Sequence, residues 1–156
     1  MSAKSQFLKK LQSRQIAPVS FSSKSQIDIA TFRLRMEHLQ EQMDEWLADT
    51  GLNMEKLTVS VTDLLVEGGA FNISAIVLSF ENRAIKFLPI FLYGQGVTGG
   101  VEVTLHAGGG ITSLGRLFMR AGNVSDWTFY PHSNLSRPGQ LFDEDTFFRL
   151  ITSLLP

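Results

Sequence analysis

The segment with the clearest potential for chemistry combines three consecutive glycines, two hydroxyl side chains and two arginines. If the residues after the glycines formed a helix, backbone N–H groups, hydroxyls and guanidinium groups would face one bound anion. In a strand, the even spacing of the arginines still keeps both on one face. The sequence therefore predicts a site for an anionic or phosphorylated small molecule, with a flexible loop followed by a strand as the alternative. The candidate ligand-binding residues are Gly108, Gly109, Gly110, Thr112, Ser113, Arg116 and Arg120.

A second glycine-rich segment, GQGVTG at 94–99, matches the GxGxxG pattern of dinucleotide-binding turns. Those turns open a helix whose N-terminus holds the pyrophosphate. Here the next residues, 101–106, alternate with the period of a strand, and no acidic residue follows at the usual distance. We therefore interpret 94–99 as the connection of a β-hairpin.

The sequence contains no complete catalytic or metal-binding signature. One residue too many separates Gly110 from Ser113 for the GxSxG motif of a serine hydrolase. The histidines, His38, His106 and His132, form no HExxH, ExxH or i, i+4 pair. The absence of cysteine excludes a thiol nucleophile, a CxxC redox centre and a Cys-ligated zinc site. The sequence thus predicts no catalytic residue, no metal and no cofactor, and it favours, without deciding, a protein that is not an enzyme.

Two further polar features occur among apolar residues. Glu102, Thr104 and His106 share one face of a predicted strand, as a polar cluster or as a solvated sheet face. Asp63 interrupts an apolar run, either as a buried acid or as the residue that ends a strand.

Length and composition predict the overall organisation. A chain of 156 residues that is 44% apolar can fold as one domain without disulfides or metal. Its net charge is −1, yet residues 1–27 carry five basic residues and no acid. We expect residues 1–24 to be a basic, flexible arm and 25–156 to be a single domain. Such an arm could contact nucleic acid, an anionic membrane surface or the acidic remainder of the chain.

No apolar run has the length of a signal peptide or of a membrane-spanning helix. We therefore expect a soluble, cytoplasmic protein with no membrane span.

An amphipathic helix is predicted from Ser25 to Ala48. Its apolar residues are spaced 3-4-3-4-3 and so share one stripe, and Gly51 suits the position after a helix. The stripe consists of Ile29, Phe32, Met36, Leu39, Met43 and Trp46. Core packing is the favoured role, but methionines also form adaptable binding surfaces. Met36, Met43 and Trp46 are therefore candidate interface residues.

A second helix is predicted at the C-terminal end of the sequence. Asp143 can cap it, and Phe142 before the cap can pack against Phe147. The apolar positions that follow share one stripe facing the core.

Between the helices, apolar residues alternate with a period of two, which is typical of strands. The candidate strands are 57–62, 70–80, 84–93 and 101–106, with weaker candidates at 114–120 and 127–130. Pro89 lacks a backbone donor, so its strand should lie at an edge or be bulged there. Short connections between sequential strands favour a meander. The predicted fold class is α+β: an antiparallel meander sheet of about five strands, an N-terminal amphipathic helix and a C-terminal helix.

The central part of the chain is poor in charge, with four charged residues among the 48 from Gly68 to Gly115. We therefore expect the second face of the sheet to be covered by the helices or by another subunit, which favours a homodimer. Residues 126–139 combine aromatic residues, an arginine and prolines, as interfaces often do. Trp127, Tyr130 and Arg137 are candidate interface residues there, although core anchoring is favoured for Trp127.

Together these features predict a non-enzymatic protein-interaction module, such as an adaptor, a secretion chaperone or a toxin-neutralising partner. Its partner is another protein, itself, or both. One alternative is a small enzyme or ligand-binding protein that recognises an anionic molecule through residues 108–120. The other is binding to nucleic acid or a membrane surface through the basic arm, which the small number of charges makes the least favoured.

Overall fold

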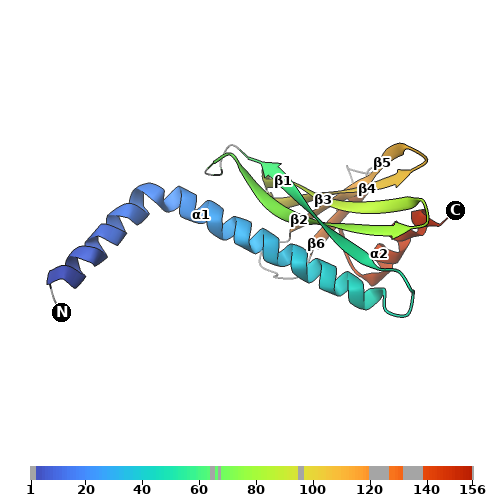
Figure 1. Cartoon of the computed structure of the whole chain (residues 1–156), viewed down its shortest axis with the longest axis horizontal. Helices are drawn as coiled ribbons and strands as arrows, with labels where there is room; N and C mark the ends of the chain where they lie inside the picture. Colours follow the sequence, from blue (N-terminus) through green and yellow to red (C-terminus); the bar gives the residue numbers. More distant parts are fainter. Residues whose placement is uncertain are drawn as a thin grey trace.

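The chain forms one antiparallel β-sheet with helices against one side, as the computed structural model in Figure 1 shows. The described residues are 3–63, 66, 68–94, 97–119, 127–131 and 139–155, with backbone alone described for 8–23, 94 and 97. Within these residues no helix is long and apolar enough to cross a membrane. The fold class is α+β, as the sequence predicts.

The first helix, α1 (Ala3–Trp46), is 44 residues long and begins well before the predicted Ser25. Residues 19–24, part of the arm expected before the helix, are helical, because serine and lysine are only mildly less favourable than alanine in a helix and no glycine interrupts them. Pro18 lies within the same helix, although proline removes one backbone hydrogen bond there. The C-terminal half of α1 lies along the sheet, whereas its N-terminal part projects away from it (Figure 1).

The sheet is a meander in which each strand pairs with the next in sequence. Its strands are β1 (Met54–Thr62), β2 (Ala70–Phe80), β3 (Arg83–Gly94), β4 (Val97–Ala107), β5 (Gly110–Met119), β6 (Trp127–Pro131) and β7 (Gln140–Leu141). The expectation of about five strands is wrong, because the described residues form seven. Two residues are too few to show a period, which explains why β7 escaped the pattern.

Local irregularities follow from particular residues. Pro89 lies in a central strand, and the pairing of β3 with β4 shifts between Pro89 and Phe91, so the predicted bulge is confirmed. Gly94 and Val97 of the GxGxxG segment pair with each other across the antiparallel strands β3 and β4, as the interpretation of a β-hairpin requires. Asp63 follows the end of β1, and its Oδ2 accepts a hydrogen bond of 3.1 Å from the backbone N–H of Tyr93.

The core lies between α1 and the sheet, and the predicted helical stripe fills it. Ile29, Phe32, Met36, Leu39 and Met43 are all buried. The ring of Phe32 contacts both Phe71 of β2 and Trp127 of β6, with centroids 6.5 and 6.3 Å apart. One helix therefore bridges strands far apart in the sheet.

Polar contacts at the edge of this core hold α1 in place. The Nε and Nη2 atoms of Arg33 donate to the backbone oxygen of Asn72 at 2.9 and 2.7 Å. The hydroxyl of Tyr93 donates to Oδ2 of Asp28. Burial, followed by this hydrogen bond to Asp28, raises the pKa of Tyr93 above its usual range. Together these bonds connect α1 to the ends of β2 and β3.

The C-terminal helix, α2 (Glu144–Ile151), is followed by a short 3₁₀ turn, η2 (Thr152–Leu154). Asp143 is its N-cap, as predicted, and accepts a hydrogen bond of 2.9 Å from the backbone N–H of Thr146. The predicted contact between Phe142 and Phe147 is present, with ring centroids 6.2 Å apart. The capped helix thereby closes one end of the core.

The cap at Asp143 gives a testable pH dependence. The backbone hydrogen bond from Thr146 lowers the pKa of Asp143 in the folded chain. Ionised Asp143 therefore stabilises the fold above its unfolded-state pKa, and this contribution is lost as the pH falls through the folded-state pKa. We expect Asp143→Ala to lower the free energy of unfolding at about pH 7 and to differ little from wild type at about pH 2.

The measurement is urea unfolding of both proteins at the two pH values. Asp143→Asn is the matched control, because it retains a capping acceptor but does not titrate. An equal deficit of Asp143→Ala at both pH values would contradict the role of the ionised cap.

Candidate functional site

The two faces of the sheet are covered unequally. Trp127 contacts Phe32 of α1, and Phe129 contacts Phe142 just before α2, with ring centroids 6.3 and 6.1 Å apart. Because these two residues of β6 are two positions apart, they share a face, and both helical elements cover that face. Tyr130 points to the opposite face, on which no described helix packs.

We call this surface the helix-free face. The pairings of β3 with β4, β4 with β5 and β5 with β6 place its residues side by side. It comprises Lys86, Leu88, Phe91, Glu102, Thr104, Ser113, Arg116, Phe118 and Tyr130. The sequence predicts that the helices or another subunit cover the second face of the sheet. The described helices cover only one face, so they do not provide this cover.

A row of three half-buried aromatic side chains crosses the helix-free face. The Phe91 and Phe118 centroids are 5.9 Å apart, and those of Phe118 and Tyr130 are 5.3 Å apart. The Phe91 ring packs closely over Gly100, its partner on β4, because glycine has no side chain. A Cβ at position 100 would lie 2.3 Å from the Phe91 ring. The row offers a broad aromatic surface instead of a deep cavity.

Polar groups flank the aromatic row. Glu102 pairs across the strands with Leu88 on one side and the exposed Arg116 on the other, and Arg116 in turn pairs with Tyr130. The Ser113 hydroxyl donates to Oε1 of Glu102 at 3.0 Å, which orients the carboxylate. The face therefore presents one carboxylate and one guanidinium group next to the aromatic rings.

The polar cluster predicted around His106 is present in part. Oγ1 of Thr104 lies 3.0 Å from Nε2 of His106, whereas Glu102 bonds to Ser113 instead. Burial, followed by the positive charge of Lys86, lowers the pKa of His106. His106 is therefore neutral at pH 7, and its ring contributes a hydrogen bond but no charge to this face.

The structure separates the residues of the predicted anion site. Gly108 and Gly109 form the exposed turn between β4 and β5, with φ of +59° and +80°. Gly110 and Thr112 are exposed within β5, while Ser113 and Arg116 lie on the helix-free face. Arg120 lies outside the described residues.

The segment after the glycines is a strand and not a helix, so an anion site at a helix N-terminus there is wrong. The physical reason is tertiary. Strand β5 is paired on both sides, with β4 and with β6, and these two sets of hydrogen bonds override any local helical tendency.

The predicted interface residues also have different surroundings. Met36, Met43 and Trp127 are buried in the core, so their side chains do not reach the surface. Trp46 is half-buried, and its ring contacts Phe142 and Phe147, with centroids 6.0 and 5.3 Å away. Of this set only Tyr130 lies on the helix-free face, and Arg137 lies outside the described residues.

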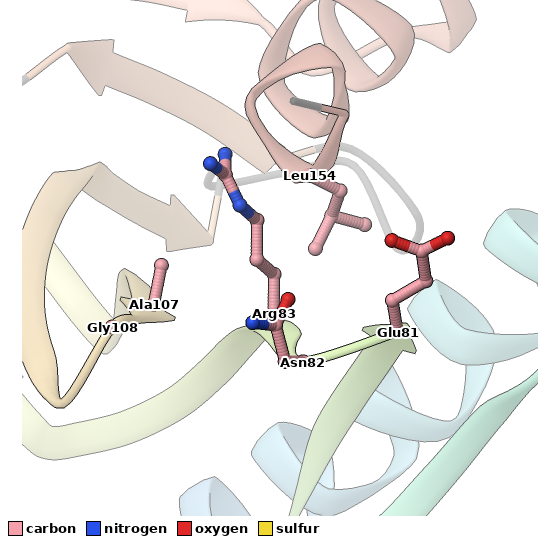
Figure 2. Close-up of a pocket in the computed structure, with 6 residues that line it drawn as sticks. All are labelled: Glu81, Asn82, Arg83, Ala107, Gly108 and Leu154. Carbon is pink, nitrogen blue, oxygen red and sulfur yellow. The ribbon is translucent and has the colours of Figure 1, made fainter.

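A cavity of about 460 Å³ opens at one end of the sheet. We call it the hairpin-end pocket, because the turn between β2 and β3, the turn between β4 and β5 and η2 meet there (Figure 2). It is lined by Glu81, Asn82, Arg83, Ala107, Gly108 and Leu154. Nη1 of Arg83 donates to the backbone oxygen of Ser153 at 3.1 Å, which holds the guanidinium group beside the pocket. Glu81 and Arg83 lie on opposite sides of Leu154 in Figure 2.

Sequence reasoning missed the pocket and two of the three aromatic residues. Residues 81–83 lie between two predicted strands and were assigned no role, although alternate turns of a meander lie at the same end of a sheet. That rule brings 81–82 and 108–109 together. For Phe91 and Phe118 no local signal existed, because apolar neighbours such as Leu92, Leu117 and Met119 put apolar residues on both faces of the strand at these positions.

Comparison with known proteins found no matching family model, no similar curated protein and no similar solved structure. The arrangement of groups on the surface is therefore the basis for the functional argument.

The close contact beneath the aromatic row gives a prediction. We expect Gly100→Ala to displace the Phe91 ring and to destabilise the fold by about 1–3 kcal/mol, as overpacking typically does. Gly110→Ala is the matched control in the same sheet, because its added Cβ would meet its nearest neighbour, the oxygen of Ala107, at 3.7 Å. Chemical unfolding gives the two free energies, and near-UV circular dichroism reports the aromatic packing. Equal effects of the two substitutions would contradict the described contact.

Proposed function

We propose that the protein is a cytoplasmic protein-interaction module that binds another polypeptide through the helix-free face. One observation carries the proposal: three aromatic rings packed against one another stay half-buried beside Arg116, on a face that no described helix covers. An adaptor, a secretion chaperone or a toxin-neutralising partner would use such a face.

The chemical make-up of this face supports a protein partner. Aromatic residues and arginine are enriched at protein interfaces, because each combines a large contact area with a directional polar group. The rings of Phe91, Phe118 and Tyr130 already contact one another, so little side-chain entropy would be lost when a partner covers them.

The charged groups beside the aromatic row indicate which chemical groups a partner should carry. Glu102 already accepts a hydrogen bond from Ser113, whereas Arg116 is exposed and its guanidinium group can bind a carboxylate through two parallel hydrogen bonds. The partner that fits is a polypeptide segment with an apolar side chain over the aromatic row and an acidic side chain at Arg116.

Reversing the charge of Arg116 tests this proposal. We expect the protein, purified gently from its own cells, to retain a stoichiometric polypeptide partner in native mass spectrometry. With that partner purified, Arg116→Glu should weaken binding at least about tenfold, because a carboxylate would then face a carboxylate.

Arg149→Glu is the matched control, because Arg149 is an exposed arginine on α2, away from the helix-free face. Thermal unfolding of both variants checks that the fold is intact. Equal affinity of wild type and Arg116→Glu would overturn the proposed face.

A second candidate function has its own observation in the hairpin-end pocket. Arg83 is held beside the pocket by Ser153, and the left-handed backbone of Gly108 forms part of its wall. We propose that, in this second function, an anionic small molecule binds there. This proposed site differs from the anion site predicted at 108–120, because its guanidinium group belongs to Arg83. Of the predicted ligand-binding residues it keeps Gly108.

Thermal unfolding with added inorganic phosphate or pyrophosphate tests this candidate. A ligand at about 100 times its Kd stabilises a folded protein by about 2.7 kcal/mol, so the melting temperature should rise with concentration. We expect Arg83→Ala to remove the rise and Arg116→Ala, on the helix-free face, to retain it. The candidate fails if neither anion raises the melting temperature, or if the two variants respond alike.

A further inference from the structure

The hairpin-end pocket is lined by two side chains of opposite charge. Glu81 and Arg83 both belong to the β2–β3 hairpin, and their side chains extend on opposite sides of Leu154 (Figure 2). Among the described residues, Glu81 forms no hydrogen bond or ion pair, and the one hydrogen bond of the Arg83 side chain goes to the backbone oxygen of Ser153. The two charges therefore do not neutralise each other, although they line the same cavity.

The backbone of the hairpin determines where both side chains begin. Phe80 and Arg83 pair across the two strands, so only Glu81 and Asn82 form the turn. Glu81 has a φ of +55°, in the left-handed region that glycine, asparagine and aspartate adopt more readily than glutamate does. The sequence thus places a carboxylate at a turn position that other residues would occupy with less strain.

The two charged groups require different binding partners. Arginine has five N–H donors, and the bond from Nη1 of Arg83 to Ser153 leaves the others for a ligand. A phosphate group accepts two parallel hydrogen bonds from such a guanidinium group. An ionised carboxylate can only accept hydrogen bonds, so the group that suits Glu81 is a cationic donor such as an ammonium group.

The size and the wall of the pocket further limit the ligand. Its volume of about 460 Å³ is in the range of pockets for small molecules. A ligand with only negative charge would gain from Arg83 but would be repelled by Glu81, and a ligand with only positive charge would experience the reverse. The side chains of Leu154 and Ala107 supply apolar surface in the same pocket.

We propose that the hairpin-end pocket binds a small zwitterionic molecule in which a short apolar chain joins a phosphate group to an ammonium group. The phosphate group binds Arg83, the chain contacts Leu154, and the ammonium group binds Glu81. This inference rests on the second candidate function, the anion site at Arg83, and names the class of its ligand.

Isothermal titration calorimetry with matched pairs of compounds tests the proposal. The probes are aminoethyl, aminobutyl and aminohexyl phosphate, and each is compared with the alkyl phosphate of the same chain length. We expect at least one aminoalkyl phosphate to bind at least about threefold more tightly than its alkyl counterpart, because only the amine provides a partner for the exposed carboxylate of Glu81.

Two substitutions separate the contributions of the two charges. Glu81→Gln should abolish the difference between the paired compounds and leave the binding of alkyl phosphate intact, because the carboxylate is removed and Arg83 remains. Arg83→Gln should weaken the binding of both compounds. Glu41→Gln is the matched control, because Glu41 is an exposed glutamate on α1 that does not line the pocket. Thermal unfolding checks that each variant is folded.

The outcomes distinguish this inference from the function on which it rests. If alkyl and aminoalkyl phosphates bind equally, or if their difference persists in Glu81→Gln, the zwitterionic ligand is wrong while the anion site at Arg83 stands. If inorganic phosphate and every organic phosphate fail to bind, the anion site fails as well. Binding to vesicles of phosphatidylethanolamine without binding of any free compound would also overturn the proposal of a small molecule.

Discussion

The packing of one stripe of α1 against one face of the sheet is the contact on which the rest of the structure depends. Phe32, Met36, Leu39 and Met43 are almost completely buried, and burial of side chains of this size contributes about 1.5–3 kcal/mol each. A meander has mainly local pairings, so nothing in the strand order alone would hold β2 near β6. The ring of Phe32, which contacts both strands, connects them across the sheet.

Coverage of one face by the helices has a consequence for the other face. A sheet this poor in charge would normally be expected to be covered on both sides. Here the second face instead has Gly100 beneath Phe91, and the aromatic rings lie against the sheet and against one another. Such packing reduces the apolar area in contact with water without removing it. The remaining area is what the proposed protein partner would cover.

Apolar and charged residues on α1 perform different tasks on opposite sides. The buried side determines where the helix lies on the sheet, with Arg33 and Asp28 adding polar contacts at the margins. The charged residues between 36 and 49 are all acidic and exposed, whereas those between 3 and 24 are all basic. The N-terminal part of α1 projects away from the sheet (Figure 1), so this part of the backbone lies apart from the described core.

Local patterns were sufficient to predict most of the elements. The stripe from Ile29 to Met43, the strand at 70–80, the bulge at Pro89 and the cap at Asp143 each depend on residues close together in sequence, so their periodicity or capping chemistry identified them. The same local patterns placed the start of the first helix at Ser25, well after its actual start, because a proline and a run of serines precede that residue.

The candidate sites could not be predicted in this way. Gly108 and Arg83 belong to different hairpins, and Phe91, Phe118 and Tyr130 belong to three different strands. Their proximity depends on the register between strands and on which face the helices cover. A sequence that is apolar on both faces of its strands leaves that choice open. The sequence by itself thus determined the elements, the meander and the charge asymmetry, because these arise from neighbouring residues. Tertiary structure alone decided which aromatic side chains stay at the surface, because only the docking of α1 and α2 distinguishes the two faces of the sheet.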